Sequence, residues 1–149
     1  MVQSATGPQL LDPAGTQAPA AQLLLVPVSA PIEGIATHYG AGYAGQSMAC
    51  GGFYASDDAS ISAVSLARDR EWECGVHLDV CGLYGCLRVV RQDSCPGCDK
   101  DHIDLSEAGI TFVCGDQADV CDVTIQALRP SAVQEPPSAP APPPVLSDP

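Results

Sequence analysis

Apolar and polar residues alternate along three stretches of the chain, which is the period of a β-strand with one buried face. The alternating apolar positions are Val76, Leu78 and Val80, then Leu87 and Val89, and then Val123, Ile125 and Ala127. Only residues 106–113 carry a pattern that predicts a helical turn or two, and glycine-rich stretches mark loops. Several short strands with one small helix predict a mainly β fold closed into a barrel, because closure leaves no exposed sheet edge.

The two ends of the chain lack this periodicity. Residues 1–33 are rich in Ala, Gln, Pro and Gly, so we predict a flexible leader there. Its apolar run at 23–28 matches a signal segment weakly, because no Lys or Arg precedes Arg68, and it is too short to span a bilayer. Residues 129–149 predict a proline-rich tail or linker, which leaves one domain at 34–128.

Charge narrows the choice of partners. Acidic residues outnumber basic ones by 18 to 6, which gives a net charge of −12. A chain this acidic repels phosphate-rich polymers and anionic membrane surfaces. We therefore expect no nucleic-acid partner and no membrane association.

The chain has eight cysteines, all within residues 50–121. An even number in the compact part of a small protein predicts disulfides and hence a secreted, extracellular protein. Zinc is the alternative, because Cys95 and Cys98 stand two residues apart with His102 nearby, but no second pair follows at the spacing of a zinc finger. We expect neither a metal nor another cofactor.

Two of the expected disulfides are local. Cys81 and Cys86 flank a Gly-Leu-Tyr-Gly turn and are placed to staple a hairpin. Cys114 and Cys121 flank a short loop in the same way. Connectivity cannot be derived from sequence, so these pairs remain expectations.

Asp104 is the first candidate for chemistry. It stands between Ile103 and Leu105, and apolar neighbours disfavour a charged carboxylate, so the group can hold a proton and act as a general acid. A second interpretation stays open, in which Asp104 caps a short helix that begins near Ser106.

Six short motifs in order resemble the double-psi β-barrel family of expansins, barwin-like proteins and the rare lipoprotein A group of septal lytic transglycosylases. The motifs are Ala-Thr-His-Tyr-Gly at 36–40, Met-Ala-Cys-Gly-Gly at 48–52, Ser-Ala-Val-Ser at 62–65, Glu-Cys-Gly at 73–75, Asp-Ser-Cys-Pro-Gly-Cys at 93–98 and His-Ile-Asp-Leu-Ser at 102–106. The resemblance covers residues 34–128 and implies a six-stranded barrel. It also implies a disulfide between Cys50 and Cys74, which leaves Cys95 and Cys98 to pair with each other or to serve as an exchange-active pair.

The resemblance assigns roles to the residues of a cleft. Asp104 matches the acid of inverting endoglucanases built on this barrel, whose base lies where this chain has Gly40 and Ala41. Asp93 is then the remaining candidate for a second catalytic carboxylate. The expected glycan-binding residues are Thr37, Tyr39, Tyr43, Trp72 and His102.

These assignments predict an exported, monomeric module that binds a cell-wall polysaccharide, either peptidoglycan or a cellulose-like glycan, and loosens it without hydrolysis. A peptidoglycan lytic transglycosylase is the first alternative, because one acid/base residue such as Asp104 can perform both proton transfers. In rare lipoprotein A proteins, however, Arg and Gly follow the position of Asp93, and a His stands where this chain has Ser65. The second alternative is a disulfide-stapled scaffold that binds another protein.

Overall fold

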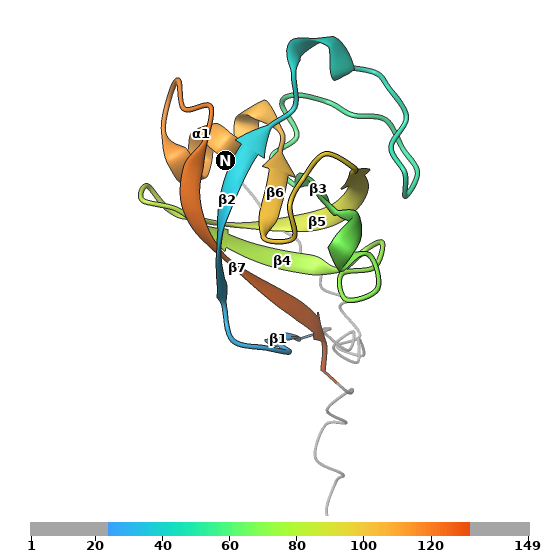
Figure 1. The fold of residues 1–149 in the computed structure, drawn as a ribbon, viewed down its shortest axis with the longest axis vertical. Coiled ribbons are helices and arrows are strands. Elements are labelled where there is room, and N and C mark those ends of the chain that lie inside the picture. The colour runs from blue at the N-terminus through green and yellow to red at the C-terminus, as the bar shows by residue number, and fades with distance from the viewer. Residues whose placement is uncertain (1–23, 132–149) are drawn as a thin grey trace, which may run out of the picture. The chain divides into compact units, whose positions relative to one another are not determined.

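The computed structural model describes residues 24–131, which contain seven strands and one α-helix, and six of the strands form a mixed barrel (Figure 1). Two single-turn 3-10 helices, η1 and η2, span Ala41–Tyr43 and Leu66–Arg68. The strands are β1 (Leu25–Pro27), β2 (Ile32–His38), β3 (Ile61–Ser65), β4 (His77–Cys81), β5 (Cys86–Cys95), β6 (His102–Leu105) and β7 (Cys121–Pro130), and the helix is α1 (Glu107–Cys114).

Six of the strands close on themselves in the order β7-β2-β6-β3-β5-β4, with β4 pairing back to β7, while β1 lies outside the ring against β7. Two pairs are parallel, β2 with β6 and β3 with β5, and the other pairs in the ring are antiparallel. The expected mainly β, six-stranded, disulfide-stapled barrel is therefore confirmed.

The alternating apolar residues of the sequence line the inside of this ring. Leu78 and Val80 of β4, Val89 of β5 and Ile125 of β7 are all at most 1% exposed, because every second side chain of a strand faces inward. Ile103 and Leu105 of β6 are fully buried in the same core. Their alternation leaves the side chains of His102 and Asp104 on the opposite face of β6.

Helix α1 covers one side of the core through Ile110 and Val113. Its N-cap is Ser106, whose hydroxyl accepts a hydrogen bond from the amide of Gly109 at 3.0 Å. Asp104 is two residues earlier, inside β6, so the helix-cap interpretation of Asp104 is wrong.

Ordered strands extend into both segments that we assigned to the ends of the chain. β1 and the first two residues of β2 lie within the expected leader, where Ile32 packs against the main core, and β7 continues to Pro130. Three residues of the apolar run thus form an outer strand, β1. The remaining leader, residues 1–23, and the tail beyond Ser131 lie outside the described residues.

Four disulfides staple the described domain, and they use all eight cysteines. They join Cys50 to Cys74, Cys81 to Cys86, Cys95 to Cys98 and Cys114 to Cys121. Each is a pair that the sequence motifs or spacing suggested. The zinc alternative for Cys95 and Cys98 is therefore wrong.

Candidate functional site

Four residues on adjacent strands stand side by side in one row across the barrel, and we call them the acid row. Thr37 of β2 pairs with Asp104 of β6, Asp104 pairs with Ala63 of β3, and Ala63 pairs with Asp93 of β5. Neighbouring strands lie about 4.8 Å apart, so the backbones of the two aspartates are separated by roughly 10 Å, with the small side chain of Ala63 between them.

A β-bulge places Asp93 in the row. β3 and β5 are in simple register through Ser62 and Arg91, and the register then shifts so that Ala63 faces Asp93 and Gln92 is passed over. The carbonyl of Gln92 instead accepts a hydrogen bond from the amide of Cys50 at 3.0 Å. A bulge of this kind redirects the side chain that follows it, here the Asp93 carboxylate.

Asp104 is linked to His102 through Thr37. The Thr37 hydroxyl donates to Oδ1 of Asp104 at 2.8 Å and lies 2.6 Å from Nε2 of His102. A hydroxyl has one proton, so His102 donates through Nε2 when Thr37 donates to Asp104. Burial raises the pKa of Asp104 above the usual carboxyl range, while the Thr37 hydrogen bond lowers it in part. The group can thus hold a proton while facing the groove.

Asp93 has a different environment. Its Oδ1 accepts from the amides of Ala49 and Ser94 at 2.8 and 2.9 Å, and its Oδ2 accepts from the Tyr39 hydroxyl at 2.8 Å. Both oxygens are occupied by donors that hold the chain in place. Within residues 24–131, by contrast, no donor bonds to Oδ2 of Asp104.

Two tyrosines line the site, and a third packs behind them. Tyr39 is only 5% exposed and stacks on Tyr54 with ring centroids 4.1 Å apart, and the ring of Tyr43 stands nearly perpendicular to that of Tyr39, with centroids 5.7 Å apart. Burial raises the pKa of the Tyr39 phenol, which keeps its proton for the hydrogen bond to Asp93. Tyr43 is 51% exposed, so it is the tyrosine of this group with a ring face free to stack on a ligand.

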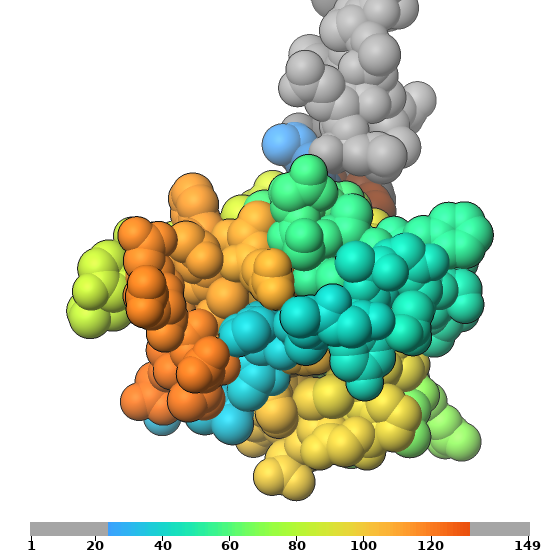
Figure 2. Space-filling model, turned by 90° about the horizontal axis from the view of Figure 1, so that it is seen from above, coloured from blue at the N-terminus to red at the C-terminus, as the bar shows by residue number. Residues whose placement is uncertain are grey.

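These residues open onto one groove with a volume of about 470 Å³. It lies at the upper end of the barrel, where Figure 2 shows the cyan and teal segment after β2 beside the yellow segment around residue 95. The residues that line it are Thr37, His38, Tyr39, Gly40, Tyr43, Ala63, Asp93, Ser94, Cys95, Pro96, Gly97, Cys98, His102 and Asp104.

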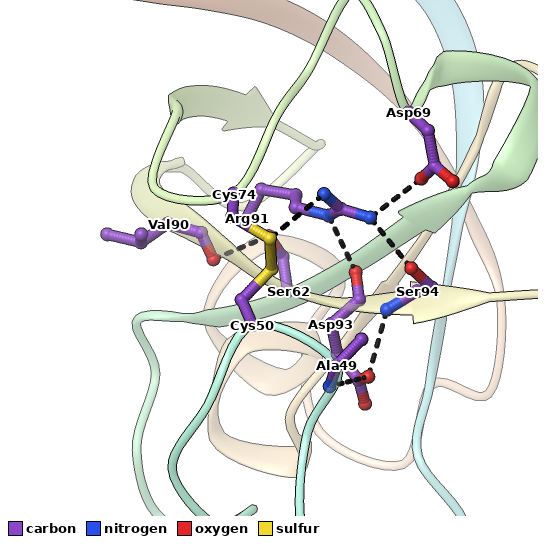
Figure 3. The surroundings of a disulfide bond; sticks show 9 residues. All are labelled: Ala49, Cys50, Ser62, Asp69, Cys74, Val90, Arg91, Asp93 and Ser94. Carbon is purple, nitrogen blue, oxygen red and sulfur yellow. Dashed lines mark hydrogen bonds and ion pairs between the residues drawn. A yellow bond between two sulfur atoms is a disulfide. The ribbon is translucent and has the colours of Figure 1, made fainter.

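The loop that carries Ala49 is anchored by a disulfide and a buried cation, Arg91 (Figure 3). Arg91 is 5% exposed, and its guanidinium donates to the Asp93 carbonyl and to Asp69 and Ser94, at 3.0, 2.7 and 2.7 Å. It also lies 3.3 Å from the sulfur of Cys74, whose partner is Cys50. This network ties the loop after β2 to β5 at the point where Asp93 enters the acid row.

Trp72 does not belong to the site. We expected it to bind glycan, but it is 3% exposed and packs in the main core, with the guanidinium of Arg68 lying 4.6 Å above its ring. The expectation is wrong because burying the large apolar ring of Trp72 stabilises the fold more than exposing it would, even though two glutamates flank it in the sequence. The other expected binding residues, Thr37, Tyr39, Tyr43 and His102, all line the groove.

Two contributors were missed from the sequence. Ala63 forms the floor between the aspartates, and the amide of Ala49 holds Asp93. Neither side chain carries chemistry, so composition gives no signal for them. The motifs at 48–52 and 62–65 contain both residues and mark the segments involved.

The described residues contain neither a candidate metal site nor a candidate membrane-spanning helix. No group of three His, Cys, Asp or Glu side chains between residues 24 and 131 is arranged to hold a metal ion. Over the same residues, no helix has the length and apolar character needed to cross a membrane.

Comparison with known proteins gives structural matches but no sequence-family match. No protein-family model matches the chain, and no curated protein matches it by sequence. Crystal structures of Clavibacter michiganensis expansin match with a TM-score of 0.58. One is the apo protein at 31% identity, and the other is a mutant with one aspartate changed to asparagine, in complex with cellohexaose, at 29% identity.

The two expansin structures and a third matching structure differ in how much of their own length the match covers. Each expansin match covers 69% of this chain and 52% of the expansin, so the chain spans about half the length of that protein. Streptomyces papain inhibitor matches at 26% identity with a TM-score of 0.58, over 70% of this chain and 99% of the inhibitor. With the closed barrel and its two parallel strand pairs, these matches confirm the resemblance: the chain contains a double-psi β-barrel of the expansin-like kind.

Proposed function

We propose that the groove binds a cell-wall polysaccharide and disrupts its packing without hydrolysing it. The observation that carries this proposal is the unequal state of the two aspartates. Asp104 keeps one carboxyl oxygen without a donor within residues 24–131 and has a raised pKa, whereas both oxygens of Asp93 are hydrogen-bonded to the protein. One proton donor faces the groove, and the other carboxylate among the described residues that line it, Asp93, is held by the protein.

This asymmetry disfavours inverting hydrolysis. That reaction needs a general acid and a separate carboxylate base, with a water held between them. Gly40 and Ala41, which occupy the position expected for the base, carry no carboxylate. Asp93 would have to release the amides of Ala49 and Ser94 before it could serve as one.

A glycan ligand fits the chemistry of the groove. Tyr43 offers a ring for stacking on a sugar, and Asp104 and His102 offer polar atoms for its hydroxyls. The expansin structure with cellohexaose supports a glucan as the ligand class. The four disulfides support secretion, because such bonds persist in oxidising surroundings.

Binding and cleavage can be separated in one experiment. The parent protein, Asp104→Asn and Ala63→Leu are incubated with purified cellulose and peptidoglycan, and retained protein is measured alongside mass spectrometry of released sugars. The leucine fills the floor between Asp104 and Asp93, and Ala63→Ser serves as its small control.

We expect the parent and Ala63→Ser to be retained, Asp104→Asn to be retained more weakly and Ala63→Leu to be lost, with no sugars released by any protein. Anhydro-sugar products that disappear in Asp104→Asn would replace the proposal with the lytic transglycosylase alternative. Equal retention of Ala63→Leu and the parent would reject the groove as the binding site.

A second candidate function is binding and inhibition of a papain-like peptidase. The specific observation in its favour is the comparison with Streptomyces papain inhibitor, which the described barrel matches over 99% of that protein's length. Inhibition of papain by the purified protein, assayed with a peptide substrate, tests this candidate directly, and lack of any effect at high protein concentration would remove it.

A further inference from the structure

The turn between β4 and β5 projects from the barrel as a narrow apolar knob. We call residues Cys81–Cys86 the stapled hairpin, because the disulfide between these two cysteines closes its base. Its tip carries Leu83, which is 89% exposed, and Tyr84, which is 69% exposed. In Figure 2 the yellow-green tip stands out from the side of the molecule, beside the orange segment that follows α1.

The stapled hairpin is held in one conformation despite this exposure. The amide of Gly82 donates to the carbonyl of Gly85 at 2.9 Å, and the amide of Tyr84 donates to the carbonyl of Val113 at 3.2 Å. Gly82 approaches α1 so closely that a Cβ atom there would lie 2.2 Å from the Val113 carbonyl oxygen. The backbone of the turn is thus docked on the end of α1.

A second contact of the stapled hairpin is made between Tyr84 and Gly115. Its φ of 93° is disfavoured for other residues, and a Cβ atom there would come within 2.8 Å of the Tyr84 ring. The Tyr84 ring therefore lies close to the backbone at the end of α1, where the disulfide from Cys114 to Cys121 closes the next loop. Part of the ring contacts the protein, whereas Leu83 beside it is almost fully exposed.

Charge around the knob restricts what it can bind. Residues 82–85 are uncharged, and the neighbouring loop carries Asp116 and Asp119, the latter with a side chain 92% exposed. A complementary partner has an apolar pocket with a neutral or basic rim. An exposed aromatic and aliphatic pair on an ordered loop is the type of anchor that dominates protein interfaces, because little conformational entropy is lost on binding.

We propose that the stapled hairpin is the surface that binds a papain-like peptidase, with Leu83 and Tyr84 entering the apolar part of its substrate cleft. This inference rests on the second candidate function and names the surface that performs it. The groove with the acid row takes no part, so peptidase binding and glycan binding are independent. No covalent step is involved.

Papain is the probe for this surface. It is activated and then freed of thiol, so that the disulfide between Cys81 and Cys86 stays oxidised during the assay. Inhibition and direct binding are measured for the parent, for Leu83→Asp and for Leu66→Asp. The last is a matched control, because Leu66 is also an exposed leucine, at 52%, and lies outside the stapled hairpin, in η2.

We expect Leu83→Asp to weaken papain binding by about thirtyfold or more, as loss of an interface anchor does. Leu66→Asp should bind as the parent does, and thermal melting should show that both variants fold. Papain whose cleft is already filled by a covalent peptide-like inhibitor should not bind the parent protein.

Three results would overturn the inference. If the parent neither binds nor inhibits papain, the second candidate function fails and the inference fails with it. If the parent inhibits papain but Leu83→Asp does so equally well, the function stands and the surface is wrong. Undiminished binding to papain with a filled cleft would likewise show that the hairpin does not enter it.

Discussion

The groove and the stapled hairpin present opposite chemistry on one barrel. The acid row of the groove is built from strand residues in fixed register, and its Asp93 is already hydrogen-bonded to three donors of the protein. The stapled hairpin is a turn whose largest side chains, Leu83 and Tyr84, are left in water. The strands thus supply positional accuracy, whereas the disulfide-closed turn supplies an exposed apolar anchor.

The difference also extends to what supports each region. Beneath the groove lies a buried network around Arg91, joined to the disulfide between Cys50 and Cys74. The stapled hairpin rests on backbone contacts to Val113 and Gly115 and on a disulfide that closes a very short loop. Substitutions that remove the Arg91 network or its disulfide should therefore lower the free energy of unfolding more than substitutions in the contacts that hold the stapled hairpin.

Among single substitutions, loss of Arg91 should have the largest effect. Arg91→Ala leaves Asp69, Ser94 and the Asp93 carbonyl without their donor and creates a cavity, so we expect a loss of about 3 kcal/mol in the free energy of unfolding. Arg88→Ala on the same strand is the control. It removes an exposed pair with Asp79 and should cost less than about 1 kcal/mol. Urea denaturation compares them, and equal losses would show that the network does not support the groove.

Removing one disulfide at a time compares how much each region's disulfide contributes to stability. Replacing Cys50 and Cys74 by serine opens a loop with a sequence separation of 24, and replacing Cys81 and Cys86 opens one of 5. The chain-entropy relation gives losses of about 3.5 and about 2 kcal/mol. Only the first pair should also weaken glycan retention, because its loop delivers the amide of Ala49 to Asp93. Chemical denaturation and a cellulose pull-down test both statements.

The pH dependence of stability should isolate Asp104 and is the smallest of these effects. The folded protein holds this proton more tightly than the unfolded chain, whose carboxyl titrates near 3.8. Between that pH and the raised pKa the native state binds more protons, so the free energy of unfolding falls as pH rises. Asp104→Asn removes this loss, and its melting temperature should exceed that of the parent at neutral pH. A difference that does not shrink toward pH 3 would contradict the raised pKa.

Much of the fold follows from patterns that are local in the sequence. Strict alternation at 76–80 and 123–127 predicts β4 and β7 because one face of each strand is buried. The cysteines that flank the 81–86 turn predict its staple because the turn brings them together. The pKa of Asp104 is raised, as its apolar neighbours led us to predict, but the cause differs: Ile103 and Leu105 face the core, and Asp104 is buried on the opposite face of β6.

What the sequence could not predict depends on long-range register and packing. The bulge between β3 and β5 puts Asp93 rather than Gln92 beside Ala63, and no local pattern encodes that shift. Trp72 is flanked by two glutamates, so its burial under Arg68 follows only from the assembled core. The outer strand β1 was hidden for the same reason, because its pairing partner β7 is about a hundred residues away.

The most direct test is nuclear magnetic resonance of the isotope-labelled protein during titration with cellohexaose. We expect saturable shifts of the amide signals of Thr37, Ala63 and Asp104 in the groove, with the signals of Leu83 and Tyr84 unchanged. Shifts confined to the stapled hairpin, or no saturable shift at the acid row for either cellohexaose or soluble peptidoglycan fragments, would contradict the claim that the groove is a glycan-binding site.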